Sequence, residues 1–311
     1  MGSTATPLFS IVIPMYNRAG FIGRALESCL SQDFGDWEAI VVDDGSTDNS
    51  SEVVGRYADP RITLLRHDLN RGVGPARNTG VDRASGEWVI CLDSDDELVP
   101  GALEQIRRRT EEVGPEMGGL RFMCRMDSGA VSPDPPFTDR VVGYRDFLLW
   151  QEEVFGRLSE TFPVVRRSTF QRVRYAKDRS LEGLYHLDFA QAFRARLCPD
   201  IVRLYHTDAN NRYCGRPRIG WLLERAADEA GRVEMMLARH GTALREYAPR
   251  VFAHLLCSAC TWHLLAGHRL RGLRYAARVT ARRPVSLKPW AIAAAGLLGP
   301  GMLARVKSLL T

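Results

Sequence analysis

Two clusters of carboxylates follow apolar runs in this sequence. Asp93, Asp95 and Asp96 come directly after the stretch WVICL, and Asp43 and Asp44 come directly after EAIVV. Carboxylates held close together raise one another's pKa unless a positive charge lies between them. Mg²⁺ and Mn²⁺ suit such oxygen-rich sites and commonly bridge one or two carboxylates to substrate phosphates. These residues therefore suggest metal-assisted binding of a phosphate-bearing ligand.

An acidic turn that caps the next helix is the alternative for the first cluster, since acids often precede helices. Taken alone, the first cluster fits both interpretations. The second cluster favours the interpretation as a ligand site, because two acidic turns on one rim imply that both bind the same ligand. Gly45 follows the second cluster and lets the backbone turn tightly there. Within the first cluster, we expect Asp96 and Glu97 to cap the following helix.

Alternating strands and helices are expected to place both clusters at one edge of a sheet. Short apolar or β-branched runs predict strands, and helical spacing of apolar residues predicts helices between them. The predicted strands are residues 9–14, 37–42, 62–66 and 87–92, and the predicted helices are residues 20–32, 50–57, 74–85 and 98–112. This alternation is typical of an α/β parallel sheet covered on both faces. Ligands of such sheets bind at the carboxyl ends of the strands, where PMYN and both acidic clusters lie.

The motifs IVIPMYN, VVDDGSTD and NRGVGPARNTGVDRASGEWVICLDSDDELVP occur in this order and together resemble the family 2 glycosyltransferases of the GT-A fold. The resemblance is close over residues 8–112 and extends loosely to about residue 213. It implies a GT-A nucleotide-diphospho-sugar transferase fold, a mostly parallel twisted sheet with helices on both faces, over residues 1–213. Residues 1–112 would form the nucleotide-binding half and residues 113–213 the acceptor half. Residues 214–311 would then be a helical, basic C-terminal region.

The resemblance also implies residues that hold the nucleotide base. Pro14 and Tyr16 match positions that line the base. Asp44 matches the aspartate that accepts a hydrogen bond from the base's ring N–H, and Asp43 stands beside it.

The same resemblance assigns the diphosphate and the metal. Asp93 and Asp95 match the DxD pair, with Ser94 between them, and hold the ribose and the metal-bound diphosphate. Asp95 is the expected direct ligand of a divalent metal, Mn²⁺ or Mg²⁺, and Asp93 the second metal residue. Arg71 or Arg77 is expected to reach the diphosphate. The metal would neutralise the charge that develops on the nucleoside-diphosphate leaving group.

An inverting enzyme of this kind needs a general base for the acceptor hydroxyl. In the family this is an aspartate, often in an ED pair, with an arginine six residues later, and HLDFAQAFR makes Asp188 the candidate. Leu187 replaces the usual preceding glutamate, so Glu182 and His186 are the alternative bases. Asp188 is also expected to be the N-cap of a helix over residues 189–196.

The C-terminal region differs in charge from the rest of the chain. Residues 247–311 carry ten Lys or Arg and no acid, whereas residues 1–246 have 32 basic against 37 acidic residues. The apolar run 289–303 is interrupted by Gly and Pro and is too short to cross a bilayer. A basic amphipathic region, residues 264–311, predicts association with an anionic membrane surface. The alternative is a helix packed on the catalytic domain. Nucleic acid is not expected, because no aromatic residues interleave the arginines.

The remaining polar motifs can be explained without a role in binding or catalysis. Cys257 and Cys260, flanked by histidines in HLLCSACTWH, could suggest zinc, but ligands spaced by three along one helix cannot close a tetrahedral site. His206 could touch the diphosphate or the metal, and a surface loop is the alternative. Seven scattered cysteines and an N-terminus without a basic segment predict a cytoplasmic protein without a signal peptide, peripheral on the inner face of the membrane.

We therefore expect an inverting transfer of a sugar from a nucleoside-diphosphate sugar, in the first place UDP-linked, to a hydroxyl of a glycan, lipid-linked or natural-product acceptor. One base and no second nucleophile predict a single displacement, hence inversion. A sugar-nucleotidyltransferase is the rival enzyme, but its glycine-rich, lysine-bearing loop is poorly matched by PMYNRAG. A non-catalytic nucleotide-sugar-binding membrane scaffold is the rival without chemistry, and it would not need a base.

Overall fold

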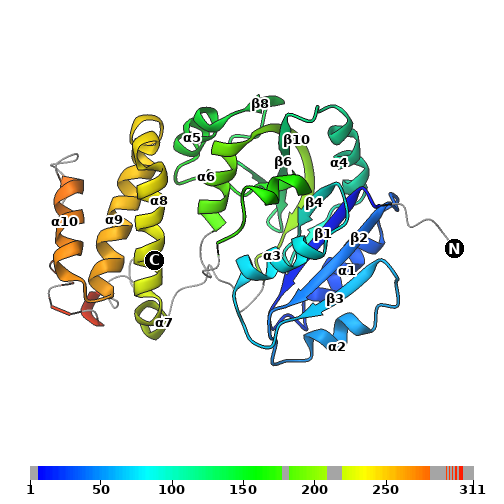
Figure 1. Ribbon diagram of the computed structural model, residues 1–311, viewed down its shortest axis with the longest axis horizontal. Coiled ribbons are helices and arrows are strands. Elements are labelled where there is room, and N and C mark those ends of the chain that lie inside the picture. The colour runs from blue at the N-terminus through cyan, green and yellow to red at the C-terminus, as the bar shows by residue number, and fades with distance from the viewer. Residues whose placement is uncertain are drawn as a thin grey trace. The chain divides into compact units, whose positions relative to one another are not determined.

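The computed structural model describes two compact units of the chain (Figure 1). The described residues are 6–176, 182–208, 219–280, 292, 294, 296, 298–299 and 301–303. The first unit, here the sheet unit, comprises residues 1–147 and 156–209. The second, here the helical unit, comprises residues 148–155 and 210–311.

The N-terminal half of the sheet is parallel, as its apolar runs predict. Strands β1 (Phe9–Met15), β2 (Trp37–Asp43), β3 (Ile62–Arg66) and β4 (Trp88–Cys91) lie in the order β3-β2-β1-β4. Met15 pairs with Asp43 and Asp43 with Arg66, so β1, β2 and β3 end at the same level. Strand β4 is parallel to them and ends at Cys91, which pairs with Val12 of β1. The loops that carry the two acidic clusters therefore leave from one edge of the sheet.

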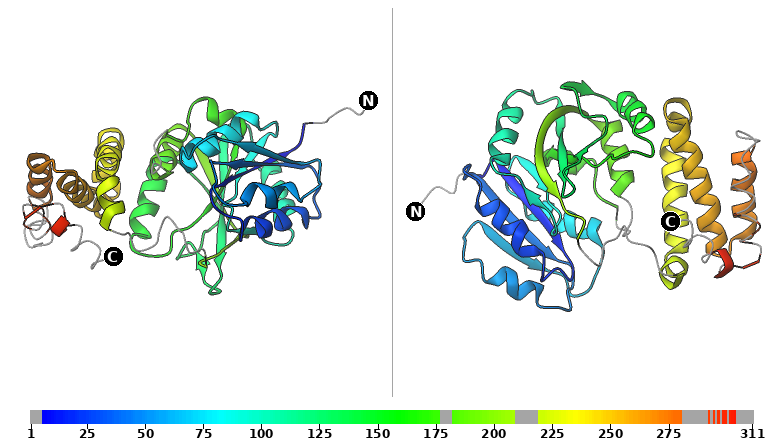
Figure 2. Two further views of the ribbon diagram at one scale, coloured as in Figure 1. Left: turned by 90° about the horizontal axis from the view of Figure 1, so that it is seen from below. Right: turned by 180° about the vertical axis from the view of Figure 1, so that it is seen from behind.

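Helices cover both faces of this half-sheet. Helix α3 (Val73–Arg83) lies in front of β1 in Figure 1, and α1 (Ile22–Leu30) lies on the opposite face, seen from behind in Figure 2. The short helix α2 (Ser50–Gly55) follows β2. Gly80 brings α3 against β1, because a Cβ at this position would lie 2.3 Å from the Cγ1 atom of the fully buried Val12.

The C-terminal half of the sheet mixes strand directions, so the expectation of a mostly parallel sheet holds only for its first half. Strand β9 (Phe162–Arg166) runs antiparallel between β4 and β6 (Met117–Met126), and β10 (Arg194–Tyr205) is parallel to β6. Short strands β5 (Glu97–Leu98), β7 (Val131–Ser132) and β8 (Arg140–Val142) add antiparallel pairs. Strand β5 directly follows the acidic loop after β4 and pairs with β10, so β10 lies next to this loop.

Two predicted helices have different bounds in the structure. The helix expected over residues 98–112 begins only at Ala102, as α4 (Ala102–Glu111), because Leu98 pairs with Arg203 in the sheet. The helix expected over residues 189–196 is α6 (Glu182–Ala192), and residue 194 already begins β10. Helix α5 (Tyr144–Glu153) and the 3-10 helix η1 (Arg167–Gln171) lie between β8 and β10 in the sequence.

The helical unit has the helical character that the sequence predicts after residue 216. It contains α7 (Ile219–Glu224), α8 (Ala226–Tyr247), α9 (Pro249–Leu265) and α10 (Arg269–Thr280), and α9 packs against both α8 and α10. The HLLCSACTWH stretch is part of α9, where Cys260 is buried and neither cysteine forms a disulfide among the described residues. Within the predicted membrane-binding region 264–311, Leu264, Leu265 and Val279 are buried inside this unit, whereas Leu270, Leu298 and Met302 are exposed.

No described helix is both long enough and apolar enough to cross a bilayer. Seven of the fifteen residues of the apolar run 289–303 lie outside the described residues.

Replacing Gly80 by alanine should destabilise the protein by about 1–3 kcal/mol, because the new methyl group overpacks the junction of α3 and β1. Urea unfolding measures this effect. The matched control is Gly231→Ala in α8, where a Cβ meets nothing within 4 Å. That variant should gain up to about 1 kcal/mol from helix propensity. Equal effects of the two substitutions would show that Gly80 has no packing role.

Candidate active site

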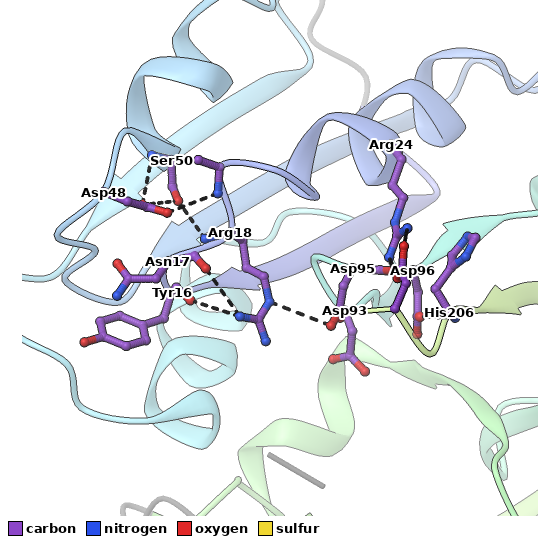
Figure 3. Close-up of polar contacts among 12 residues, drawn as sticks. Tyr16, Asn17, Arg18, Arg24, Asp48, Ser50, Asp93, Asp95, Asp96 and His206 are labelled. Atoms are coloured by element: carbon purple, nitrogen blue, oxygen red, sulfur yellow. Dashed lines mark hydrogen bonds and ion pairs between the residues drawn. The ribbon is translucent and has the colours of Figure 1, made fainter. Parts of the chain in front are cut away.

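The turn after β1 is tied to the loop after β2. Asn17 has a positive φ of 52°, its amide N–H donates to Ser46 Oγ at 2.9 Å, and the Arg18 amide donates to Ser50 Oγ at 2.7 Å. This geometry leaves Tyr16 at the rim with 40% of its surface exposed (Figure 3). Pro14, by contrast, is buried within β1.

Asp43 is a structural carboxylate at the end of β2. It is fully buried, and its Oδ1 atom accepts from the Ser46 amide at 2.8 Å. Ser51 Oγ donates to the Oδ2 atom, and Arg66 Nε lies 3.7 Å from the same oxygen. The residue predicted to stand beside the base-binding aspartate therefore holds the 46–51 loop in place.

Asp44 organises the neighbouring loop, residues 67–72. Its Oδ1 atom accepts from the Arg71 amide at 2.9 Å and contacts His67 Nδ1 at 2.7 Å, and its Oδ2 atom accepts from the Gly72 amide at 2.7 Å. The Arg71 side chain is exposed beside this carboxylate. The predicted base-binding residues Tyr16 and Asp44 thus both border the carboxyl ends of β1 and β2.

Asp93 lies between two buried guanidinium groups. Arg77 Nη2 on α3 donates to its Oδ1 atom at 2.8 Å, and Arg203 Nη1 on β10 lies 3.7 Å from its Oδ2 atom. Both arginines are only 4% exposed. The structure therefore places Arg77 on the DxD aspartate, and it provides Asp93 with positive charge before any ligand binds.

The carboxylate of Asp95 has fewer and longer contacts with the described side chains than that of Asp93. Its carboxylate makes no hydrogen bond to the described residues, and its one ion pair there is with Arg18 Nε at 3.7 Å (Figure 3). The main-chain carbonyl of Asp95 accepts a short hydrogen bond from Arg24 Nη2. Its neighbour Ser94 is buried. The backbone is thus fixed while the carboxylate stays available, which suits a direct metal ligand.

Asp96 and Glu97 do not cap α4, contrary to the expectation from sequence. The helix begins after Gly101 with no side-chain cap. Asp96 is 1% exposed, accepts from the His206 amide at 2.9 Å and has Arg203 Nη1 3.5 Å from its Oδ2 atom. Glu97 Oε1 contacts His206 Nε2 at 2.6 Å. The two acids therefore fix the residue that follows β10 against the DxD turn, and the pairing of β5 with β10 holds Glu97 beside it.

Burial raises the pKa of Asp96 to about 7, although the nearby Arg203 opposes this change. The neighbouring carboxylates of Asp93 and Asp95 add to the rise. The turn therefore holds one acid that is partly protonated near neutral pH.

The segment after β10 is held against this turn by a second arginine. The Nη1 and Nη2 atoms of Arg24 each lie 2.9 Å from a carboxylate oxygen of Asp208, so one guanidinium joins Asp208 to the Asp95 carbonyl. The Thr207 amide donates to Asp127 at 2.7 Å. His206 consequently lies beside the acids, as Figure 3 shows, and not in a free surface loop.

Asp188 lies inside α6, which starts at Glu182, so its predicted role as an N-cap is wrong. It is half-buried, and its negative charge adds to the burial that raises the pKa of Tyr144 to about 12. His186 lies 3.2 Å from the buried Arg121, and desolvation together with this guanidinium lowers the His186 pKa well below its usual value. The side chain of Glu182 lies outside the described residues.

Sequence reasoning missed the three arginines that neutralise the DxD turn. Arg18 lies before α1, Arg24 lies on α1, and Arg203 comes from β10. Only Arg203 carries a signal in the sequence, because a charge inside the run IVRLY needs a buried acidic partner.

A divalent cation fits this turn if the substrate completes its coordination. Among the described residues, no three His, Cys, Asp or Glu side chains are grouped to hold a metal by themselves. Mg²⁺ and Mn²⁺ sites commonly use one or two carboxylates together with phosphate oxygens. The Asp95 carboxylate, with Asp93 two residues away, meets that requirement.

A sheet whose acid-bearing loops leave the carboxyl ends of β2 and β4, and whose second half is mixed, is that of the GT-A fold of nucleotide-sugar-dependent transferases. Two solved structures share this fold. The chain resembles Staphylococcus aureus TarS 1–349 in complex with UDP-GlcNAc, with a TM-score of 0.56, 17% identity, and coverage of 96% of this chain and 90% of that one. It also resembles the Pyrobaculum calidifontis mannosyltransferase PcManGT in complex with GDP-Man and Mn²⁺, with a TM-score of 0.53, 20% identity, and coverage of 98% and 88%.

The chain belongs to glycosyl transferase family 2, whose family model matches residues 10–173. One curated relative is the GalNAc(5)-diNAcBac-PP-undecaprenol beta-1,3-glucosyltransferase of Campylobacter jejuni. It is 39% identical over 109 residues, which are 34% of this chain and 35% of the relative. The first curated relatives are matched over 32% to 62% of their own lengths.

Replacing Asp96 by asparagine should change how stability depends on pH. The folded pKa of about 7 lies above the ordinary value of 3.8, so ionisation of Asp96 weakens the fold as pH rises through this range. The free energy of unfolding of Asp96→Asn minus that of the parent should therefore increase from about pH 4 to about pH 7. Urea unfolding across this range measures the difference, and a constant difference would contradict the raised pKa.

Proposed function

We propose that this chain catalyses metal-assisted, inverting transfer of a sugar from a nucleoside-diphosphate sugar, expected to be UDP-linked, to an acceptor hydroxyl. The observation that carries the proposal is the division of charge at the DxD turn. Asp93 and Asp96 have arginine partners, whereas the Asp95 carboxylate has one ion pair at 3.7 Å and no hydrogen bond to the described residues. Such a turn can accept a cation that arrives with a diphosphate. The UDP-GlcNAc complex of TarS supports a UDP donor.

The nucleotide would lie over the carboxyl ends of β1 and β2. The exposed ring of Tyr16 offers a surface on which the base can stack, with Pro14 behind it. Asp44 is the proposed acceptor for the base N–H, and the buried Asp43 holds the adjoining loop. The ribose and diphosphate would then reach Asp93, Ser94 and Asp95 on the next strand.

Asp95 is the proposed first metal ligand and Asp93 the second, with Mn²⁺ or Mg²⁺ as the metal. The Mn²⁺ in the PcManGT complex supports this assignment. When bound, the metal would offset negative charge on the leaving diphosphate. Arg18 lies beside Asp95 and the exposed Arg71 lies in the loop after β3, so both can add positive charge at the diphosphate. Arg77 donates to Asp93 at 2.8 Å, so it would act on the diphosphate through that residue.

Asp188 is the proposed general base, which takes the proton of the acceptor hydroxyl as its oxygen attacks the anomeric carbon. His186 suits this role less well, because the adjacent Arg121 disfavours the imidazolium that it would become. A helix interior holds the Asp188 side chain at a fixed place. The alternative, Glu182, begins the same helix.

The acceptor is proposed to be a hydroxyl of a glycan carried on a lipid, as the name of the Campylobacter relative describes for that protein. Such an acceptor places the enzyme at the cytoplasmic face of a membrane. Residues 264–311 would provide the contact, through the exposed arginines of α10 and Leu270, which is 74% exposed. Leu264, Leu265 and Val279 pack inside the helical unit and are not free to insert, whereas Leu298 and Met302 are exposed as Leu270 is.

Replacing Asp95 by alanine should weaken Mn²⁺-dependent binding of UDP at least about tenfold, because the cation loses its direct ligand. Calorimetric titration of UDP with and without Mn²⁺ measures the effect. Asp33→Ala is the control, since Asp33 is an exposed carboxylate elsewhere in the sheet unit. Binding that does not depend on metal in the parent protein would refute the metal assignment.

Replacing Asp188 by asparagine should leave UDP affinity unchanged and slow transfer about 10²–10⁴-fold, the usual contribution of a general base. The slow hydrolysis of a UDP-sugar, with water as the acceptor, allows the rate to be measured before the acceptor is identified. Glu182→Gln tests the alternative base in the same assay. A rate for Asp188→Asn equal to that of the parent would exclude Asp188.

A further inference from the structure

The helical unit contains a cavity of about 410 Å³ that is lined mainly by arginines. Arg271, Arg274 and Arg278 of α10 line it, together with Tyr275 and with Glu234 of α8. The three arginines are three and four residues apart, so they project from the same side of the helix. Because the positions are fixed by one regular helix, the guanidinium groups converge on a common space.

Tyr275, one of the residues that line this cavity, is stacked on a ring of α9. His263 of α9 contacts Glu234 Oε1 through its Nε2 atom at 2.8 Å, and its ring stacks on Tyr275 at 5.5 Å with an interplanar angle of 7°. Arg278 lies over the Tyr275 ring at 5.2 Å. Burial lowers the pKa of His263, which favours the neutral ring. The arginines thus stand on a supported surface.

The lining has an excess of positive charge. Three arginines face one glutamate, and Glu234 is shared with His263 and lies 3.9 Å from Arg271. Neither Arg274 nor Arg278 forms an ion pair with a carboxylate among the described residues, and the sequence has no acid after Glu246. Net charge of about two units therefore remains for a ligand to balance.

We propose that this cavity binds the phosphomonoester headgroup of an anionic membrane lipid. A phosphomonoester carries a charge of about −1.5 to −2 and three strong acceptor oxygens, which matches the lining. Guanidinium groups bind phosphate oxygens in a bidentate manner, so three of them can surround such a group. The inference rests on the membrane association proposed above, and it replaces a diffuse basic surface by one defined site.

Leu270 favours a lipid over free phosphate as the source of this group. It immediately precedes Arg271 and is 74% exposed, so an apolar side chain stands beside the first of the three arginines, at the start of α10. A side chain in that position can enter the headgroup region of a bilayer while the arginines hold the phosphate. Free inorganic phosphate would gain nothing from it.

Binding of the full-length protein to vesicles tests the site. Phosphatidylcholine vesicles containing phosphatidic acid supply a phosphomonoester, and vesicles with phosphatidylglycerol at equal negative charge supply only a diester. We expect a preference for phosphatidic acid that Arg274→Gln/Arg278→Gln lowers at least about tenfold, since each basic residue near an anionic surface contributes about a fivefold effect. The control Arg245→Gln/Arg269→Gln removes the same charge at exposed positions of α8 and α10 outside the cavity lining.

Equal losses in the two double variants, or equal binding to both vesicle types, would show a diffuse electrostatic surface and overturn the site. Full competition by millimolar inorganic phosphate would overturn the lipid as the source. Glu234→Gln can still accept from His263 and should tighten binding, because it removes the one acid in the lining. Hydrolysis of a UDP-sugar in solution should be unchanged in Arg274→Gln/Arg278→Gln, which separates failure of this site from failure of the proposed transfer.

Discussion

The acidic turn after β4 depends on the ion pairs that the buried guanidinium of Arg203 forms. This guanidinium lies 3.7 Å from Asp93, 3.5 Å from Asp96 and 3.3 Å from Glu160, in a position that is only 4% exposed. Without a cation there, these carboxylates would repel one another at the end of a buried strand. The strand that supplies Arg203 belongs to the mixed half of the sheet. That half therefore does more than extend the sheet, because its arginine offsets the repulsion among the carboxylates that follow the parallel half.

The parallel half of the fold is readable from sequence because each of its strands is a short, continuous apolar run. Strand β10 is not, since Pro199, Asp200 and Arg203 interrupt its pattern. Asp200 and Arg203 are charged residues whose partners lie elsewhere in the chain. The start of α6 was misplaced for a related reason. An aspartate before an apolar run resembles an N-cap, but Leu184 and Tyr185 are also buried and extend the helix to Glu182.

The carboxylates of the candidate site were visible in the sequence, and their positions at strand ends follow from the parallel sheet. Their partners were not visible, because contacts set by tertiary structure leave no local pattern. Arg24 reaches an Asp95 carbonyl 71 residues away and an Asp208 carboxylate 184 residues away. The difference between the predicted role of Asp96, a helix cap, and its observed role, a partner of β10, has the same origin. Sequence therefore predicts which residue types gather at the rim more readily than which ones remain available there.

The tie between Asn17 and Ser46 has a consequence for ligand entry. Two loops that leave neighbouring strands are joined by hydrogen bonds of 2.9 Å and 2.7 Å, so the rim is arranged before a donor arrives. Much of the conformational entropy of these loops is lost when the chain folds and not when it binds. A nucleotide that meets such a rim is selected by shape at first contact, and its dissociation rate then reflects broken contacts more than loops that reopen.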